Sequence, residues 1–161
     1  MVRRGETGDI SKMAEIYCQD IKETYKSILP KDYLEHVTIE ESKKIWLNFM
    51  EKKGHLCLLW EEYDILGFAG IKEDEVRKRC TMLSSVYVAK DAQGRGIGKR
   101  LIEEVFQEAR MRGSEFVSVS VVMKNERAKN IYEGLGAKYE KSHIYYFGVH
   151  PVQCGKYLWR L

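Results

Sequence analysis

The sequence predicts an α/β fold with a mixed, mostly antiparallel central sheet and helices on both of its faces. Three strand-like runs follow one another between residues 55 and 88, so short turns should join them as antiparallel neighbours. A long amphipathic helix then joins Val86–Val88 to a valine-rich run at residues 116–122, and a helical crossover of this kind makes two strands parallel. The length of 161 residues suits one domain, residues 1–161.

The first half of the chain predicts a short extended start and two helical regions before the strands. Thr7, Gly8 and Asp9 supply capping chemistry, and apolar residues then recur at helical spacing. Pro30 interrupts this pattern, and Gly54 ends the second helical region. The expected elements are an extended segment at 2–4, helices at about 9–25, 31–37 and 40–53, and strands at 55–61, 65–72 and about 79–88.

The second half alternates helix and strand and closes with a hairpin. Arg112 and Gly113 end the long helix, and a second, shorter helix starts near Asn125. The remaining expected elements are a strand at 116–122, the short helix ending at 134 or 136, and strands at about 137–147 and 154–161 joined across residues 148–151.

The stretch from Gln93 to Gly98, with glycines at alternate positions, carries the first indication of function. It follows an apolar strand and opens directly into the long helix. Glycines leave backbone N–H groups uncovered, and the first turn of a helix adds unpartnered donors at the positive end of the helix dipole. The stretch is therefore expected to bind an anion such as a phosphate.

Two common phosphate-binding motifs do not fit this stretch. A dinucleotide fingerprint G-x-G-x-x-G that starts at Gly94 would need a glycine where Lys99 stands. A Walker-type loop needs Ser or Thr after its Gly-Lys pair, but Arg100 follows here. These mismatches exclude a nucleotide-binding module of either kind. A glycine-rich turn without a ligand stays open for this stretch taken alone.

A second motif follows one helix and one strand later. Residues 125–137 fit the pattern N-x-x-A-x-x-x-Y-x-x-x-G, and residues 93–98 fit Q-x-x-G-x-G. With these two motifs the chain resembles the GNAT superfamily of N-acetyltransferases, whose element order β-α-α-β-β-β-α-β-α-β-β it also matches. The motifs lie between Val86 and Ala137, and the first half matches in element order alone. The Ser85–Val88 run and the Tyr- and Trp-rich end make it most similar to the phosphinothricin-type small-molecule acetyltransferases.

The resemblance implies a GNAT fold with an acetyl-CoA site where two parallel strands splay apart. Main-chain groups of the Val86–Val88 strand would bind pantetheine as an added strand would, and the glycine stretch would bind the pyrophosphate, with Gln93 bracing the loop. Asn125 is expected to cap its helix, with a contact to pantetheine as an alternative role. The implied acetyl-CoA-binding residues are Val86, Tyr87, Val88, Gln93, Gly94, Arg95, Gly96, Ile97, Gly98, Lys99, Asn125 and Tyr132, and the charges of Arg95, Lys99 and Arg100 can add to phosphate binding.

The implied reaction transfers an acetyl group from acetyl-CoA to a primary amine by direct attack through a tetrahedral intermediate. Tyr132 is the implied catalytic residue. A phenol of pKa about 10 is a weaker acid than a thiol of about 8.5, so we expect Tyr132 to stabilise the leaving thiolate by a hydrogen bond. No general base is identified, because Met82–Ser85 and Ser120 stand where family members carry a glutamate. Water, Asp20, Glu23 or an amine that arrives neutral remain as alternatives.

The acceptor is expected to be a small-molecule amine, bound between the first two helices and the last hairpin. Aromatic side chains there can surround a cationic amine. The candidates are Tyr25, Ile28, Leu29, Tyr33, Trp46, His143, Tyr145, Tyr146 and Trp159. Two other functions stay open: acetylation of a protein or peptide N-terminal amine, and a non-catalytic acetyl-CoA-binding regulator.

Composition limits the partners. The net charge of +3 is scattered along the chain, which argues against nucleic acid. No signal peptide or long apolar run is found, so no membrane association and a cytoplasmic location are expected. Cys18, Cys57, Cys80 and Cys154 lack metal-ligand spacing, so they are expected to be reduced and buried, with no metal. The sequence does not decide whether the chain forms a homodimer.

Overall fold

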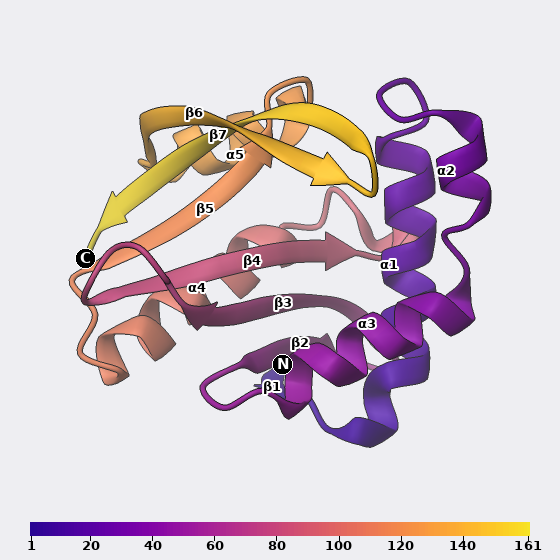
Figure 1. Cartoon of the computed structure of the whole chain (residues 1–161). Coiled ribbons are helices and arrows are strands. Elements are labelled where there is room, and N and C mark those ends of the chain that lie inside the picture. The colour runs from indigo at the N-terminus through magenta and orange to yellow at the C-terminus, as the bar shows by residue number, and fades with distance from the viewer.

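The computed structural model describes residues 1–161 and contains one seven-stranded mixed sheet (Figure 1). The strand order is β1-β2-β3-β4-β5-β7-β6, and every neighbouring pair is antiparallel except β4 and β5. This is the mostly antiparallel sheet that the sequence predicts. The strands are β1 (Val2–Arg4), β2 (Leu56–Glu61), β3 (Ile65–Glu73), β4 (Cys80–Val88), β5 (Phe116–Val122), β6 (Lys138–Phe147) and β7 (His150–Arg160).

Helices cover both faces of the sheet, as expected. On one face, Leu101 and Val105 of α4 pack against Leu83 in the larger core. On the other face, Met13 of α1 and Trp46 of α3 pack in a second core. None of the helices has the length and apolar character needed to cross a lipid bilayer. The helices are η1 (Thr7–Asp9), α1 (Ile10–Thr24), α2 (Lys31–Glu35), α3 (Ile39–Glu51), η2 (Lys90–Ala92), α4 (Ile97–Met111) and α5 (Glu126–Gly134).

The parallel strands β4 and β5 pair only over their first halves. Cys80–Leu83 lie opposite Phe116–Val119, and no pairing continues beyond them. The register between β3 and β4 shifts just there, between Gly70 and Ile71, and an irregularity of this kind bends a strand. Because β5 stays paired with β7 as far as Val122, the two parallel strands diverge toward their carboxyl ends (Figure 1). One edge of β4 is thereby left without a neighbouring strand.

A buried carboxylate fixes the opposite, paired end of β4 and β5. Asp74 follows β3 and is 7% exposed. Its carboxylate accepts a hydrogen bond from the Ser118 hydroxyl of β5 at 2.6 Å and lies 3.0 Å from Nζ of Lys156 on β7. The backbone N–H groups of Val76 and Arg77 also donate to it, at 2.8 Å each. Burial alone raises the pKa of Asp74, but these hydrogen bonds outweigh it and lower that pKa below its usual value.

The last hairpin is longer than expected, because β7 begins at His150 and not near Cys154. Residues 150–153 continue the pairing with β6 around a turn at Gly148, where φ is +61°. Pro151 is accommodated inside this strand because β5 ends at Val122, opposite Cys154. At Pro151, the edge of β7 that faces away from β6 has no neighbouring strand. The N–H group that Pro151 lacks would lie on this edge, so no ladder hydrogen bond is lost.

We expect Asp74→Ala to lower the free energy of unfolding by about 3–5 kcal/mol, because it leaves the ammonium of Lys156 buried without a partner. Urea unfolding followed by circular dichroism measures the loss. The double variant Asp74→Ala/Lys156→Met removes both charges and should recover most of it. Glu75→Ala, an exposed neighbour, is the control. Equal losses in the single and double variants would contradict this account of the ion pair.

Candidate active site

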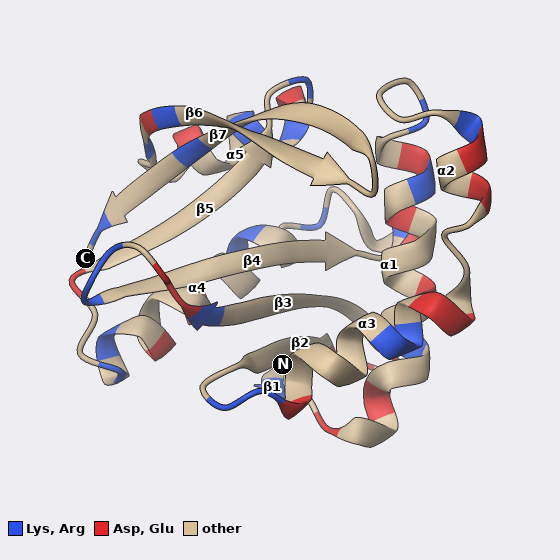
Figure 2. Ribbon diagram, in the orientation of Figure 1, with Lys and Arg blue, Asp and Glu red and all other residues tan.

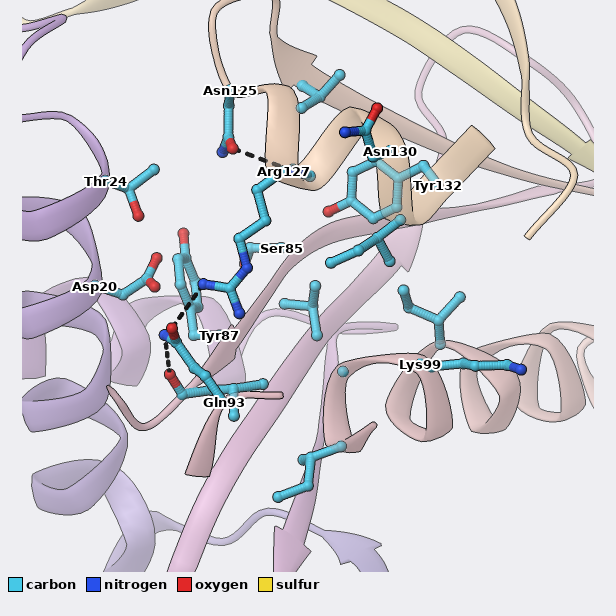
Figure 3. A pocket seen from close by; sticks show the side chains of 18 of the residues that line it. Asp20, Thr24, Ser85, Tyr87, Gln93, Lys99, Asn125, Arg127, Asn130 and Tyr132 are labelled. Carbon is cyan, nitrogen blue, oxygen red and sulfur yellow. Dashed lines mark hydrogen bonds between the residues drawn. The ribbon is translucent and has the colours of Figure 1, made fainter. Parts of the chain in front are cut away.

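A cavity of about 760 Å³ opens where β4 and β5 diverge (Figure 3). Its walls come from α1, β4, the loop before α4, the first turns of α4, β5 and α5. Most residues that the resemblance implies as acetyl-CoA-binding line this one cavity. They are Val86, Tyr87, Val88, Gln93, Gly94, Gly96, Ile97, Gly98, Lys99, Asn125 and Tyr132.

The basic side chains near the glycine loop do not all reach the cavity. The guanidinium of Arg95 pairs with Glu62 at 2.7 Å, and that of Arg100 lies 5.5 Å from the centre of the Trp60 ring. Of the three basic residues expected to add positive charge, Lys99 alone lines the cavity. A contribution of Arg95 to anion binding would have to come from its backbone N–H.

The uncovered edge of β4 presents main-chain groups to the cavity. The N–H of Ala89 donates to a carbonyl of β3 at 2.8 Å. Since bonding groups alternate along a strand, those of Tyr87 face β3, and those of Val86 and Val88 face the cavity. The Val88 carbonyl accepts a hydrogen bond from Nε2 of Gln93 at 3.1 Å, so this side chain braces the loop. The Val88 N–H and both groups of Val86 lack a ladder partner on β5.

The glycine loop leaves the start of α4 open. Gly94 and Gly96 have φ angles of +80° and +79°, and a Cβ on either would find no atom within 4 Å. Gly98 lies in the first turn of α4, and a Cβ there would contact only Val88, at 3.7 Å. No side chain of these three residues therefore covers the first N–H groups of the helix, at the positive end of its dipole.

α5 brings Tyr132 and Asn125 to the cavity. Tyr132 is 6% exposed, and its ring meets Trp159 edge-on at a centroid distance of 5.7 Å. Burial raises the pKa of this phenol well above its usual value, so the hydroxyl keeps its proton at neutral pH and acts as a hydrogen-bond donor. Asn125 caps α5 as expected, since its Oδ1 accepts from the N–H of Ala128 at 3.2 Å.

The structure separates the two carboxylates that the sequence leaves as alternative bases. Asp20 lines the cavity, whereas Glu23 lies at the surface beside Lys26, at 3.1 Å. Burial raises the pKa of Asp20 to about 6, and the charge of Arg127 and the hydroxyl of Thr24 limit that rise. Residues three or four apart on a helix lie on similar faces, so the spacing of Asp20 and Glu23 could not show which of them reaches the cavity.

Arg127 bridges the cavity and was not among the expected site residues. Its Nη1 donates to Oε1 of Gln93 at 2.6 Å, which joins α5 to the loop before α4 (Figure 3). The second motif leaves the position between Asn125 and Ala128 unspecified, so it carries no signal for this contact. The bridge lies in front of the free edge of β4 that Ser85 and its neighbours form (Figure 3).

The expected acceptor residues divide between the core and the cavity. Trp46 and Trp159 are each 4% exposed and belong to the two cores. Tyr25 lines the cavity. The tip of the β6–β7 hairpin reaches this region, because the ring of Phe147 lies 5.4 Å from Tyr25 and 6.2 Å from Tyr33. An aromatic wall thus continues from the cavity toward α2.

The cysteines and histidines are the remaining candidates for nucleophilic or metal chemistry. All four cysteines are unpaired and buried. No group of three or more His, Cys, Asp or Glu side chains converges into a metal-binding cluster. Nε2 of His143 lies 3.1 Å from the hydroxyl of Ser120, a residue that lines the cavity.

Comparison with known proteins assigns a family to this arrangement. Residues 18–137 match the profile of the Acetyltransferase (GNAT) family, and the chain belongs to that family. It is 30% identical over 121 residues to the 5-NmdU N-acetyltransferase of Pseudomonas phage PaMx11, covering 69% of this chain and 84% of the relative. It is 26% identical over 141 residues to the L-amino acid N-acyltransferase MnaT of Escherichia coli strain K12, covering 84% and 77%. The chain is therefore an acyltransferase of the N-acetyltransferase type.

Solved structures confirm the fold. The ribosomal-protein-alanine N-acetyltransferase of Brucella melitensis matches with a TM-score of 0.78 at 22% identity, over 100% of this chain and 99% of that one. The PaiA N-acetyltransferase of Thermoplasma acidophilum, solved with coenzyme A, matches with 0.74 at 20% identity over 98% of both. A protein provisionally named a phosphinothricin N-acetyltransferase matches with 0.78 at 15% identity, over 100% and 98%. These similarities establish the architecture, not the acceptor.

Proposed function

We propose that residues 1–161 act as one N-acetyltransferase domain, which transfers the acetyl group of acetyl-CoA to the primary amine of a small molecule. The observation that carries the proposal is the convergence in one cavity of the free β4 edge, the open start of α4 and the Tyr132 hydroxyl. The first two can bind a diphosphate-bearing amide chain, and the third can act on its thioester.

The cavity fits the requirements of acetyl-CoA. Pantetheine contains amide groups that would hydrogen-bond to the backbone of Val86 and Val88, as an added strand does. The N–H groups between Gly94 and Lys99 would bind the pyrophosphate, because Gly94 and Gly96 carry no side chain and the space beside them is open. Each charge-assisted hydrogen bond of this kind contributes about 1.5–3 kcal/mol. Acetyl-CoA supplies the activated acetyl group and the thiolate leaving group.

Tyr132 would stabilise the developing thiolate by donating a hydrogen bond to the sulfur. Its raised pKa keeps the phenol protonated, which preserves the donor. The same raised pKa makes full proton transfer to a thiolate unfavourable, since thiols ionise near pH 8.5. We therefore assign Tyr132 a stabilising role, and the proton that ends on the thiol comes from the attacking nitrogen.

A small-molecule acceptor is supported by the relatives and by the charge distribution. One relative is named for an L-amino acid and another for 5-NmdU. Basic and acidic residues are interspersed along α1 and α2 (Figure 2), a pattern that favours a small acceptor over a polyanion. The four unpaired thiols suit a reducing compartment, so a cytoplasmic location is part of the proposal.

A panel of amines tests the activity. We expect coenzyme A release from acetyl-CoA with small primary amines, amino acids or polyamines, measured with a thiol reagent, and slower release with peptides. Release with N-terminal peptides alone would indicate the alternative acceptor class. Coenzyme A binding without release for any amine would support the non-catalytic regulator.

Gly98→Ala should weaken coenzyme A binding about tenfold in calorimetric titration, because the added methyl group stands where a phosphate must approach the helix N–H groups. Unfolding stability should not fall, since alanine is favoured over glycine in a helix by about 0.5–1 kcal/mol. Gly98 is a cleaner site than Gly96, whose φ of +79° would strain any side chain. Gly134→Ala, an exposed helical glycine of α5 outside the cavity, is the matched control.

Tyr132→Phe should reduce kcat by about tenfold or more, with a small effect on KM for acetyl-CoA, because one hydrogen bond to the leaving group is lost. Steady-state kinetics with a reactive amine measures both constants. Tyr63→Phe, in the exposed turn between β2 and β3 and outside the cavity, controls for the loss of a phenol. A decrease in kcat of less than about threefold would remove Tyr132 from the catalytic assignment.

A further inference from the structure

The cavity contains one carboxylate. Of all residues that line it, Asp20 alone is acidic, and the positions on β4 and β5 next to the opening carry the hydroxyls of Ser84, Ser85 and Ser120. An amine that enters as an ammonium ion therefore meets one anionic partner. We propose that Asp20 binds the ammonium group of a primary alkylamine and accepts its proton before the amine attacks. This inference rests on the proposed acetyl transfer.

Asp20 is held toward the reacting region by its place on α1. Figure 3 shows its side chain beside Tyr87 and Gln93, with Thr24 one turn further along the helix. Tyr25, Tyr87 and Tyr132 line the same cavity as Asp20. Burial, with a smaller contribution from the charge of Asp20, raises the pKa of all three phenols.

The groups that face Asp20 from other elements leave its carboxylate available. They are the phenol of Tyr87 on β4, that of Tyr132 across the cavity and the guanidinium of Arg127 on α5. These phenols, and that of Tyr25 at the end of α1, are uncharged at neutral pH. Arg127 is engaged with Gln93 at 2.6 Å, and no hydrogen bond joins it to Asp20. A second cation can therefore approach the carboxylate from the cavity side.

An ammonium ion must lose a proton before its nitrogen can attack, and Asp20 can accept that proton. An alkylamine has a pKa of about 10.4, so only about one molecule in 10³ is neutral at neutral pH. Asp20 accepts one proton from the bound ammonium ion and later releases it to water. The nitrogen then bonds to the acetyl carbon, the carbon–sulfur bond breaks, and the second proton leaves the nitrogen for the thiolate. Tyr132 donates its hydrogen bond to the sulfur throughout.

The aromatic surroundings specify the substrate class. Tyr25 lines the cavity, and Phe147 and Tyr33 extend this wall toward the hairpin tip. Rings of this kind attract a cation and pack against an apolar body. The acceptor is therefore a primary alkylamine on an aromatic or apolar group.

Asp20→Asn tests this role with two acceptors that share a ring. Benzylamine is charged at neutral pH and needs a base, whereas aniline is neutral and does not. We expect kcat/KM for benzylamine to fall about 10²-fold or more in Asp20→Asn, with a change below about threefold for aniline. Glu23→Gln, at the surface of the same helix, is the matched control and should change neither.

The pH dependence gives a second readout. With benzylamine, kcat/KM of the wild type should rise to a plateau above about pH 6, where Asp20 is ionised. In Asp20→Asn it should instead rise about tenfold per pH unit toward the pKa of the amine, because only free amine then reacts. Asp20→Glu, which keeps the carboxylate, should retain part of the plateau.

Distinct outcomes overturn the inference and the function beneath it. Equal losses for benzylamine and aniline in Asp20→Asn, or a wild-type pH profile in that variant, would exclude Asp20 as the proton acceptor while leaving acetyl transfer intact. A wild-type enzyme that acetylates neither amine, nor any other, would overturn the proposed function itself. Coenzyme A titration of each variant confirms that the cavity is folded. If Asp20→Asn fails this check, Asp20→Glu decides: a variant that keeps the carboxylate but no longer prefers benzylamine to aniline would contradict the role.

Discussion

The separation of two parallel strands after four paired residues governs the rest of this structure. Backbone N–H and C=O groups inside a protein need hydrogen-bond partners, and a sheet ordinarily supplies them strand by strand. Beyond Leu83 and Val119, β4 no longer receives them from β5. The fold therefore contains a strand edge in the middle of its sheet, where a ligand with amide groups can complete the ladder.

The two ends of this strand pair are stabilised in different ways. At the paired end, the buried Asp74 joins the turn after β3 to β5 and β7 through Ser118 and Lys156. At the open end, Gln93 and Arg127 connect the glycine loop to α5 through one polar contact near solvent. A buried, multiply bonded carboxylate is costly to disturb, whereas an exposed side-chain contact contributes little. Disturbing the strand pair should therefore cost more free energy at its paired end than at the end where a ligand would enter.

Local chemistry explains how much of the architecture the sequence predicts. Glycines with a required positive φ, a capping asparagine and the 3.6-residue period each act over a few residues, so Gly96, Asn125 and the faces of α4 could be read directly. The start of β7 was misplaced because Pro151 is tolerated only where the neighbouring strand has ended, and that is a property of the sheet register.

The composition of the cavity depends on contacts between distant parts of the chain, which no local pattern encodes. Gln93 and Arg127 are 34 residues apart. Asp20 lines the same cavity as Tyr132 only because α1 lies at the carboxyl end of β4 (Figure 1). Burial also divided the aromatic residues, since Trp46 and Trp159 fill the cores while Tyr25 remains at the cavity. The sequence could therefore name the type of site and offer Asp20 and Lys99 as candidates, but it could not choose between Asp20 and Glu23 or identify Arg127.

The hydrogen bond between Arg127 and Gln93 would couple ligand binding along β4 to the pKa of Asp20. A chain bound along β4 that displaced this guanidinium would remove the charge that limits the rise in the pKa of Asp20. A carboxylate without that neighbour is the stronger base. If Asp20 accepts the proton of the amine as proposed, a thiol carrier bound along β4 would therefore favour that proton transfer.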